Sequence, residues 1–460
     1  MEKLNIKDIL KACDGELFCG NENIRVNGFS KDTRTINLGD IYVGIKGENL
    51  DGNSYYKEAI EKGAAACIIE EDFKNKLELE SIKESTIIIV KNSVKALQDI
   101  ARYTRLNCNI PVVAVTGSVG KTSTKDIIAS GLSKKYDVLK TEGNNNNHIG
   151  LPLTILKLKN QNAMVLEMGM NHFGEISTLT NIAKPSICVI TNIGTSHIGN
   201  LGSRENILKA KLEILEGMQE SGTIVINNDN DLLNKWASEN KGKYNIVTFG
   251  IENASDYMAY DIKENEDNVE YKINILEKEY DVKVPVPGKN FVYNSLSAIA
   301  VGILNKVEPE KIIEGIKEFK LTKKRMEIIK QNGITIINDS YNASYDSVKS
   351  ALEYLKTATG KRKIAVLGDM LELGDFSKEL HEKVGEEVVK NNIDILVTVG
   401  KLAKHIANIA KENGIREVES FEKNEEAVEY LNKQIQEDDV ILLKASNSMR
   451  FGKILDKITK

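Results

Sequence analysis

The clearest pattern along the chain is a set of short, continuous apolar runs that alternate with helical stretches through its middle part. The runs are PVVAVT, AMVLEM, SICVIT and TIVIN, between residues 111 and 227. Continuous apolar strands separated by helices are typical of a parallel sheet covered on both faces. The pattern therefore predicts a doubly wound, mostly parallel sheet. A more polar segment follows near 252–284, where the alternation in VEYKINIL predicts an antiparallel edge hairpin.

Other strand patterns lie on each side of this region. Beyond residue 320, four further strand patterns predict a Rossmann-like domain: ITIIND, KIAVLGD, DILVTVG and DVILLKA. The dinucleotide-binding motif G-x-G-x-x-G is absent, so we expect no nicotinamide cofactor. Before residue 105 the chain shows short segments, Gly-Asp and Asp-Gly turns, and a closing helix in NSVKALQDIARYTR that Asn92 or Ser93 would cap. We expect an α/β protein of three domains, at 1–104, 105–318 and 319–460.

Composition and charge narrow the class of protein. The 460 residues include 62 basic and 67 acidic side chains, a formal net charge of −5, which gives no reason to expect nucleic-acid or membrane binding. The amino-terminal segment lacks the apolar core of a signal peptide, and no run of about 18 apolar residues occurs, so we expect a cytoplasmic protein without membrane insertion. Five scattered cysteines without C-x-x-C spacing are expected to be buried apolar residues.

A glycine-rich loop connects the first central strand to a helix. It consists of Gly117, Ser118, Val119 and Gly120, and is followed by Lys121, Thr122 and Ser123. Backbone N–H groups of such a loop and the helix N-terminus bind phosphates, the lysine reaches the β- and γ-phosphates, and the threonine hydroxyl coordinates Mg²⁺. The usual P-loop motif begins with a glycine five residues before Gly120, and Val115 occupies that position here. This departure narrows the choice of P-loop families to those with a shortened loop. A simple glycine-rich turn is the disfavoured alternative, because both flanks match a nucleotide site.

Three further residues are candidates for metal chemistry. Glu167 ends an apolar run, where a carboxylate is costly unless it meets a cation. His197 follows the strand SICVIT and could bind a second divalent ion, although a structural histidine is the usual alternative. Lys211 lies in register with the apolar positions of its helix, so it either extends its ammonium to solvent or has a special function. The sequence leaves these two alternatives for Lys211 open.

The motifs resemble those of the Mur ligase family over essentially the whole chain. The central stretches are TGSVGKT, TEGNNNNHIGLP, LEMGMNHFGEI and TNIGTSHIGNLGSRENILKAKLEI, and GKNFVYNSLSA and KRMEII continue them. Residues 338–355, 365–381 and 443–451 resemble the members that add D-alanyl-D-alanine, and residues 29–56 are similar to the uridine-nucleotide domain of the late ligases. Lys289 departs from the pattern, because a histidine is common there.

This resemblance implies an ATP-dependent ligase that joins D-Ala-D-Ala to UDP-MurNAc-tripeptide through an acyl phosphate. It implies a first Mg²⁺ at Thr122 and Glu167, and a second at His197 and at Lys211 after carbamylation by CO₂. We expect a monomer. The alternatives are the family member that adds the third residue, diaminopimelate or lysine, and, from another class, a P-loop regulatory NTPase.

The resemblance also assigns contacts residue by residue. The catalytic residues would be Lys121, Glu167, His197 and Lys211. ATP would be contacted by the glycine-rich loop and by Asn290, Asn294, Arg325 and Asp339. The UDP-linked substrate would be contacted by Asn144, Asn146 and Asn147, with Ser30, Asp32 and Arg34 at the uridine diphosphate end, and D-Ala-D-Ala by Tyr341, Asn342 and Ser446. A turn with a surface ion pair is the alternative for Ser30, Asp32 and Arg34, and a disordered polar tract is the alternative for the asparagines.

Overall fold

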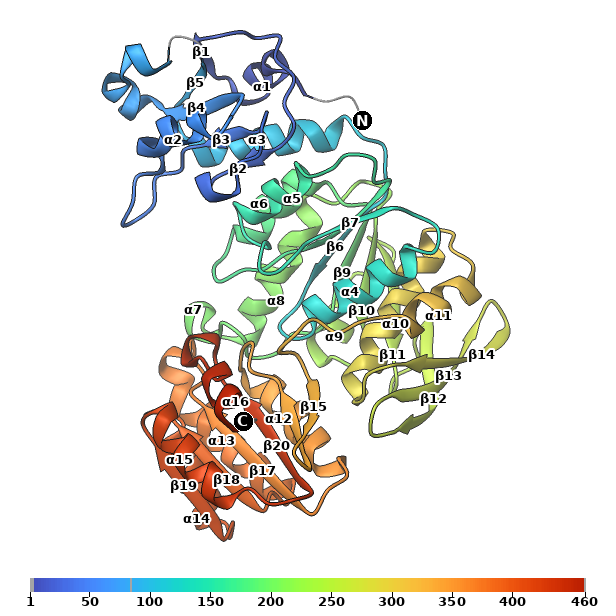
Figure 1. Ribbon diagram of the computed structural model, residues 1–460. Coiled ribbons are helices and arrows are strands. Elements are labelled where there is room, and N and C mark those ends of the chain that lie inside the picture. The colour runs from blue at the N-terminus through green and yellow to red at the C-terminus, as the bar shows by residue number, and fades with distance from the viewer. Residues whose placement is uncertain (1–3, 83–84, 459–460) are drawn as a thin grey trace.

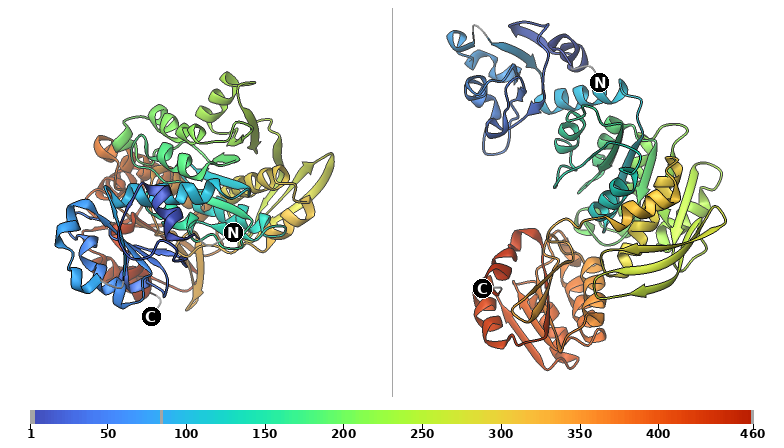
Figure 2. Two further views of the ribbon diagram at one scale, coloured as in Figure 1. Left: turned by 90° about the horizontal axis from the view of Figure 1, so that it is seen from above. Right: turned by 45° about the vertical axis from the view of Figure 1, so that its right-hand side comes forward.

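The computed structural model describes residues 4–82 and 85–458 and has three parts arranged as a crescent (Figure 1). The amino-terminal and carboxyl-terminal parts form the two ends, and the central part joins them, as the right-hand view of Figure 2 also shows. Each part contains one sheet, of five, nine and six strands in chain order. Each of the three predicted domain ranges therefore contains one sheet.

The amino-terminal sheet has the strand order β1-β5-β4-β3-β2, with β1 antiparallel to β5 and the other neighbours parallel. Its strands are β1 (Glu16–Cys19), β2 (Phe29–Ser30), β3 (Ile41–Val43), β4 (Ala66–Glu70) and β5 (Thr86–Val90). The helices are α1 (Ile6–Cys13), α2 (Tyr56–Glu61) and α3 (Ser93–Leu106), with 3₁₀ turns η1 (Thr33–Thr35), η2 (Gly52–Tyr55), η3 (Glu71–Lys76) and η4 (Leu79–Ile82).

Helix α3 connects the first part to the second. Its N-cap is Asn92, whose side chain accepts a hydrogen bond from the N–H of Lys95, so the predicted cap is confirmed. At its other end Arg105, only 4% exposed, donates to the carbonyl oxygens of Ala183 (2.7 Å) and Lys184 (3.0 Å). These bonds hold the closing helix of the first domain against the central one.

The central sheet has the order β14-β13-β12-β11-β10-β9-β6-β8-β7, parallel from β12 to β7. The predicted edge hairpin is a three-stranded antiparallel meander, because β12 also pairs with β13 and β13 with β14. The strands are β6 (Val112–Thr116), β7 (Val138–Lys140), β8 (Ala163–Glu167), β9 (Ile187–Ile190), β10 (Thr223–Asn227), β11 (Asn245–Gly250), β12 (Tyr257–Glu264), β13 (Val269–Ile275) and β14 (Lys278–Val284).

Helices cover both faces of this sheet, as the apolar strands predicted. Along β6, Val112 and Ala114 belong to one apolar core, and Val113 and Val115 belong to another on the opposite face. The helices are α4 (Lys121–Leu132), α5 (Gly150–Ile155), α6 (Glu175–Ala183), α7 (Ile198–Leu201), α8 (Arg204–Leu212), η5 (Glu213–Glu216), α9 (Asp231–Glu239), α10 (Lys289–Leu304) and α11 (Pro309–Lys317).

The third sheet has the order β15-β16-β20-β17-β18-β19, and only the pairing of β15 with β16 is antiparallel. Its strands are β15 (Glu327–Gln331), β16 (Ile334–Asn338), β17 (Arg362–Gly368), β18 (Ile395–Val399), β19 (Glu417–Phe421) and β20 (Asp439–Lys444). The helices are α12 (Tyr345–Thr357), η6 (Gly374–Phe376), α13 (Ser377–Lys390), α14 (Lys404–Glu412), α15 (Asn424–Gln434), η7 (Asn447–Met449) and α16 (Gly452–Ile458).

Two expectations about the whole chain can be compared with the fold. Within residues 4–82 and 85–458, no helix has the length and apolar character needed to cross a membrane. All five cysteines carry free thiols; Cys67 and Cys188 are buried, as expected, but Cys13, Cys19 and Cys108 are partly exposed.

Candidate active site

The glycine-rich loop lies between β6 and α4, as predicted. Gly117 has φ 151° and packs so closely on the next loop that a Cβ would lie 1.9 Å from Thr191 Oγ1. Gly120 is the N-cap of α4 with φ 83° and has no side chain to satisfy the first helical N–H groups. The Lys121 ammonium donates to the carbonyl oxygens of Gly117 (2.8 Å) and Ser118 (3.3 Å). The loop therefore offers backbone N–H groups and a cation to a phosphate.

A buried carboxylate lies beside the threonine of this loop. Glu167, at the end of β8 and 2% exposed, accepts a hydrogen bond from the Thr122 hydroxyl at Oε2 (2.8 Å) and from the Asn146 amide at Oε1 (2.8 Å). A hydroxyl and a carboxylate are oxygen ligands of the kind that Mg²⁺ prefers. These residues fit the predicted first magnesium site.

A cleft of about 1100 Å³ lies between the central and third domains. It brings together predicted residues from segments more than 200 positions apart. Its lining includes Ser118, Val119, Gly120, Lys121, Thr122, Ser123, Asn144, Asn146, Asn147, Glu167, His197, Asn290, Asn294, Arg325, Asp339, Tyr341 and Asn342. The lining does not include Gly117, Lys211, Ser446, Ser30, Asp32 or Arg34.

Two of the cations that the third domain contributes to the cleft contact other lining residues. The Arg325 guanidinium stacks on the Tyr341 ring, with 3.9 Å between its central carbon and the ring centroid. Lys444, at the end of β20 and 2% exposed, forms an ion pair with Asp339 and donates to the carbonyl oxygen of Asn342 (3.1 Å). Sequence reasoning missed Lys444, although its position at the end of the apolar run DVILLKA was a usable signal.

Lys211 is buried in α8 and only 1% exposed, so its side chain does not extend to solvent. Burial, and then the charge of Lys121, lower the pKa of the Lys211 ammonium well below its ordinary value. Burial also lowers the pKa of Lys121, with Arg325 adding to the effect and Glu167 opposing it. A lowered pKa favours the neutral amine of Lys211 over the ammonium.

His197 is the N-cap of α7 and lines the cleft. Its backbone has the left-handed conformation, with φ 65°. Its Nδ1 lies 2.8 Å from Oε2 of Glu372 in the third domain. Among the described residues no group of three or more His, Cys, Asp or Glu side chains could hold a metal ion. The two predicted magnesium sites also use Thr122 and carbamylated Lys211 as ligands. Groups of His, Cys, Asp and Glu side chains do not include these two residues.

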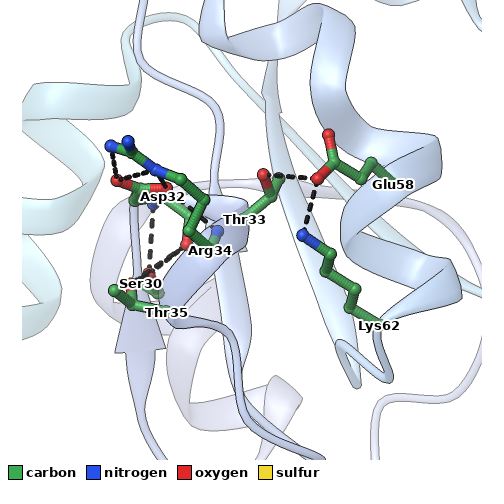
Figure 3. A network of polar contacts seen from close by, with 7 residues as sticks. All are labelled: Ser30, Asp32, Thr33, Arg34, Thr35, Glu58 and Lys62. Carbon is green, nitrogen blue, oxygen red and sulfur yellow. Dashed lines mark hydrogen bonds and ion pairs between the residues drawn. The ribbon is translucent and has the colours of Figure 1, made fainter.

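The polar residues predicted for the uridine diphosphate end contact one another (Figure 3). Arg34 donates from Nε to Asp32 Oδ1 (2.9 Å), and this interaction lowers the pKa of the Asp32 carboxyl to about 2. The Ser30 hydroxyl donates to the carbonyl oxygen of Asp32 (2.9 Å). The structure thus contains the turn and surface ion pair of the alternative interpretation. Phosphate binding by Arg34, whose side chain is 83% exposed, remains a prediction.

Ser446 lies outside the cleft lining and is 5% exposed. Its hydroxyl accepts a hydrogen bond from the N–H of Leu371 (2.9 Å) and so holds the loop after β17. Contact of Ser446 with D-Ala-D-Ala remains a prediction.

Sequence reasoning also missed acidic residues of the cleft, and two of them hold loops at its edge. Asp229 accepts hydrogen bonds from the N–H groups of Ile251 (2.6 Å) and Asn253 (2.7 Å) and from the Tyr293 hydroxyl (2.9 Å). It therefore fixes the loop after β11 against α10, the helix that carries two of the predicted ATP contacts, Asn290 and Asn294. Asp346, at the start of α12, accepts from the N–H and hydroxyl of Thr195. Its partner lies 151 positions away, so no local pattern could identify it.

The fold and the cleft place the chain among the P-loop enzymes that use ATP. It matches the Mur ligase family catalytic domain over residues 25–105, the Mur ligase middle domain over 115–302, and the Mur ligase glutamate ligase domain over 324–447. The chain belongs to the Mur ligase family, and it is an ATP-dependent ligase.

Individual relatives agree with this assignment. The chain is 37% identical to the UDP-N-acetylmuramoyl-tripeptide--D-alanyl-D-alanine ligase of Bacillus subtilis (strain 168), over 99% of this chain and 98% of the relative. Its fold is similar to that of MurF from Acinetobacter baumannii, with a TM-score of 0.89, 27% identity and coverage of 100% and 99% of the two chains. It is also similar to MurF ligase from Thermotoga maritima in complex with ADP, with a TM-score of 0.82, 29% identity and coverage of 94% and 97%.

Proposed function

We propose that this enzyme joins D-alanyl-D-alanine to UDP-N-acetylmuramoyl-tripeptide and converts ATP to ADP and phosphate. The product would be UDP-MurNAc-pentapeptide, a precursor of peptidoglycan. The observation that carries the proposal is the 37% identity, over 99% of the chain, to a ligase of that name. The cleft supports it, because one cavity is lined by most of the residues expected to contact ATP, by the three asparagines expected to contact the UDP-linked substrate, and by two of the three residues expected to contact the dipeptide.

The reaction has two steps. The terminal carboxylate of the tripeptide attacks the γ-phosphate of ATP, which gives an acyl phosphate and ADP. The free amine of D-Ala-D-Ala then attacks the acyl carbon, and phosphate leaves. The first step brings two anions together, so the site must neutralise charge and hold the reacting atoms in line.

Cations from two domains supply part of that neutralisation. Lys121 and the N-terminus of α4 belong to the central domain, and Arg325 belongs to the third. Arg325 is close enough to Lys121 to contribute to lowering its pKa. A phosphate between these two cations would be stabilised from both sides, and the site would be complete only when both domains contact the substrates.

Two Mg²⁺ ions would be held by the predicted ligands. Thr122 and Glu167 would hold the first, and His197 with the carbamate of Lys211 would hold the second. When bound, the ions neutralise phosphate charge and align the carboxylate with the γ-phosphate. The lowered pKa of Lys211 supports this role, because CO₂ adds to a neutral amine and leaves an oxygen ligand.

We propose that the enzyme acts as a monomer in the cytoplasm. The use of ATP as a substrate supports action in the cytoplasm. The ligase that adds the third residue and a regulatory NTPase are the competing functions. They differ from the proposed function in the amine that they require, a single amino acid or none.

Product analysis tests the proposal. The protein would be incubated with Mg-ATP, UDP-MurNAc-tripeptide and D-Ala-D-Ala, and the products weighed by mass spectrometry, with the Lys121→Ala variant as the inactive control. We expect UDP-MurNAc-pentapeptide from the wild type only. A tripeptide product formed from UDP-MurNAc-dipeptide and diaminopimelate or lysine, without any pentapeptide, would contradict the proposal.

A further inference from the structure

The third domain contacts the candidate metal ligand His197 through Glu372, a residue of the GDMLELG segment that the proposed mechanism does not use. We propose that Glu372 is a positioning residue, which holds the imidazole of His197 by Nδ1 and leaves Nε2 as the metal-binding nitrogen. The second cation site is then complete only when the third domain is docked on the central one. This inference rests on the proposed role of His197 as a ligand.

The side chains of His197 and Glu372 form a histidine–carboxylate pair. Glu372 Oε2 lies 2.8 Å from His197 Nδ1, a buried nitrogen, but away from the direction of a straight hydrogen bond. In proteins without bound substrates such bonds are often poorly aligned and straighten when the complex forms. His197 lines the cleft, and its side chain is 17% exposed, so its second nitrogen is the one left to a ligand.

The backbone around this pair is tightly constrained. Gly199 donates its N–H to the carbonyl oxygen of Glu372 (3.2 Å), and a Cβ on Gly199 would lie 2.5 Å from the nitrogen of Gly374. His197 and Glu372 both have left-handed backbones, with φ 65° and 63°. Such conformations are unfavourable for these residue types and persist where the surrounding structure imposes them, often at functional sites. A surface ion pair would need none of these features.

A second carboxylate of the third domain holds the same loop. Asp346 Oδ2 accepts from the N–H (2.7 Å) and the hydroxyl (2.8 Å) of Thr195, two positions before His197. The N–H of Gly194 donates to the Ser118 hydroxyl (2.9 Å), which ties the loop to the phosphate-binding loop. The third domain therefore reaches both the predicted second metal site and the phosphate site through one short segment.

A carboxylate behind a histidine ligand has a known physical effect. It fixes which nitrogen carries the proton, orients the ring and raises the basicity of the metal-binding nitrogen. Loss of such a partner typically weakens metal affinity by about 10- to 100-fold. We therefore expect Glu372 to change the affinity of the second site while leaving the site at Thr122 and Glu167 as it is.

The test uses Mn²⁺ as the probe, in the full-length protein with ADP and bicarbonate. Mn²⁺ binding to the wild type and to Glu372→Gln is followed by electron paramagnetic resonance, and ¹⁵N-labelled histidine reports the coupling of His197 to the bound ion. Glu379→Gln is the matched control, because Glu379 is an exposed glutamate of the same domain that pairs with Lys383 within α13 (2.6 Å). Glu372→Asp, which keeps the charge but shortens the side chain, is the second variant.

We expect Glu372→Gln to weaken the second Mn²⁺ site by tenfold or more and to reduce the histidine coupling, with the first site unchanged. Glu372→Asp should fall between Glu372→Gln and the wild type. Equal binding and coupling in Glu372→Gln and Glu379→Gln would overturn the inference. This measurement needs no amine substrate, so its failure is distinct from a failure of the proposed D-Ala-D-Ala ligase activity.

Discussion

The hydroxyl of Thr122 donates a 2.8 Å hydrogen bond to Oε2 of Glu167, which joins the start of α4 to the end of β8. The two residues lie 45 positions apart. Glu167 ends β8, and Thr122 lies in the helix that follows β6, the parallel neighbour of β8 whose carboxyl end lies at the same edge of the sheet. This contact places a buried carboxylate beside the phosphate-binding loop. It is the structural reason to expect a divalent cation there.

The first prediction concerns Lys211. Replacing it with alanine removes the buried amine that CO₂ would modify. Loss of an outer-shell partner of a metal ligand typically costs about 10- to 100-fold in activity, so we expect the loss of a ligand to lower ligase activity at least about 100-fold. Added formate or acetate should restore part of the activity by supplying a carboxylate in the vacated space. Activity would be measured as product formed with and without these anions.

The matched control for this experiment is Lys209→Ala, because Lys209 is exposed on the same helix. We expect that variant to keep wild-type activity. Full activity of Lys211→Ala without any added carboxylate would refute the carbamate assignment.

The second prediction concerns Gly117. A Cβ there would lie 1.9 Å from Thr191 Oγ1, and the φ of 151° is unfavourable for alanine. Strain of about 1–3 kcal/mol in a loop that binds phosphate should weaken ATP binding by roughly 5- to 150-fold. Isothermal titration calorimetry with ATP measures the dissociation constant of the variant and of the wild type.

Gly452→Ala is the control, since a Cβ at Gly452 would meet no atom within 4 Å. Adding Thr191→Ala to Gly117→Ala should recover part of the affinity, because it removes the clashing oxygen. Unchanged ATP affinity in Gly117→Ala would show that the loop does not need its close approach to Thr191.

The third prediction concerns the connection between the first two domains. Arg105→Leu would leave the carbonyl oxygens of Ala183, Lys184 and Cys108 without their buried donor. We expect the free energy of unfolding to fall by about 3 kcal/mol. Hydrogen exchange should become faster in α3 and near residue 184. The exposed Arg102 of the same helix provides the control, Arg102→Leu, and equal stability of the two variants would contradict the prediction.

The fourth prediction concerns pH and His381, which is fully buried in α13. Its Nδ1 donates to the carbonyl oxygen of Ser377 (2.6 Å), and its Nε2 accepts from the N–H of Met370 (3.0 Å), so the bonded imidazole is neutral. Burial lowers the pKa of His381 below the ordinary 6.5. Because the unfolded chain then binds a proton more readily, His381 should make the protein less stable as pH falls below 6.5 toward the folded-state pKa.

His381→Gln should flatten this part of the pH dependence of the thermal midpoint, measured between pH values of about 5.5 and 7.5 around the ordinary histidine pKa. The control is His172→Gln, a change at an exposed histidine. This variant should keep the pH dependence of the wild type. Parallel curves for His381→Gln and the wild type would contradict the prediction.

Local patterns predicted much of the fold and of the nucleotide site. The apolar runs of β6, β8, β9 and β10 and the motif that ends at Thr122 are continuous in sequence, so periodicity and spacing were sufficient. Strand β19, with sequence EVESF, is an edge strand with largely polar side chains, and its pattern gave no such indication. The edge hairpin gained a third strand because β12 pairs both with the parallel sheet and with β13.

Contacts between domains could not be predicted in this way. His197 and Glu372, and Thr195 and Asp346, come together through the docking of two separately folded sheets. His197 was predicted as a metal ligand without its partner, and the other three residues alone resemble ordinary surface residues. The burial of Lys211 was likewise open, because its position on the apolar side of α8 fitted two outcomes until the side chain proved 1% exposed.

The central claim is that this ligase uses D-Ala-D-Ala as its amine. The most direct measurement is phosphate release from Mg-ATP with UDP-MurNAc-tripeptide, compared with D-Ala-D-Ala, with no amine, and with diaminopimelate on the dipeptide substrate. We predict rapid release only with D-Ala-D-Ala, because phosphate leaves when the amine attacks the acyl phosphate. Release that needs no amine would instead indicate an NTPase, and release that needs diaminopimelate would indicate the ligase for the third residue.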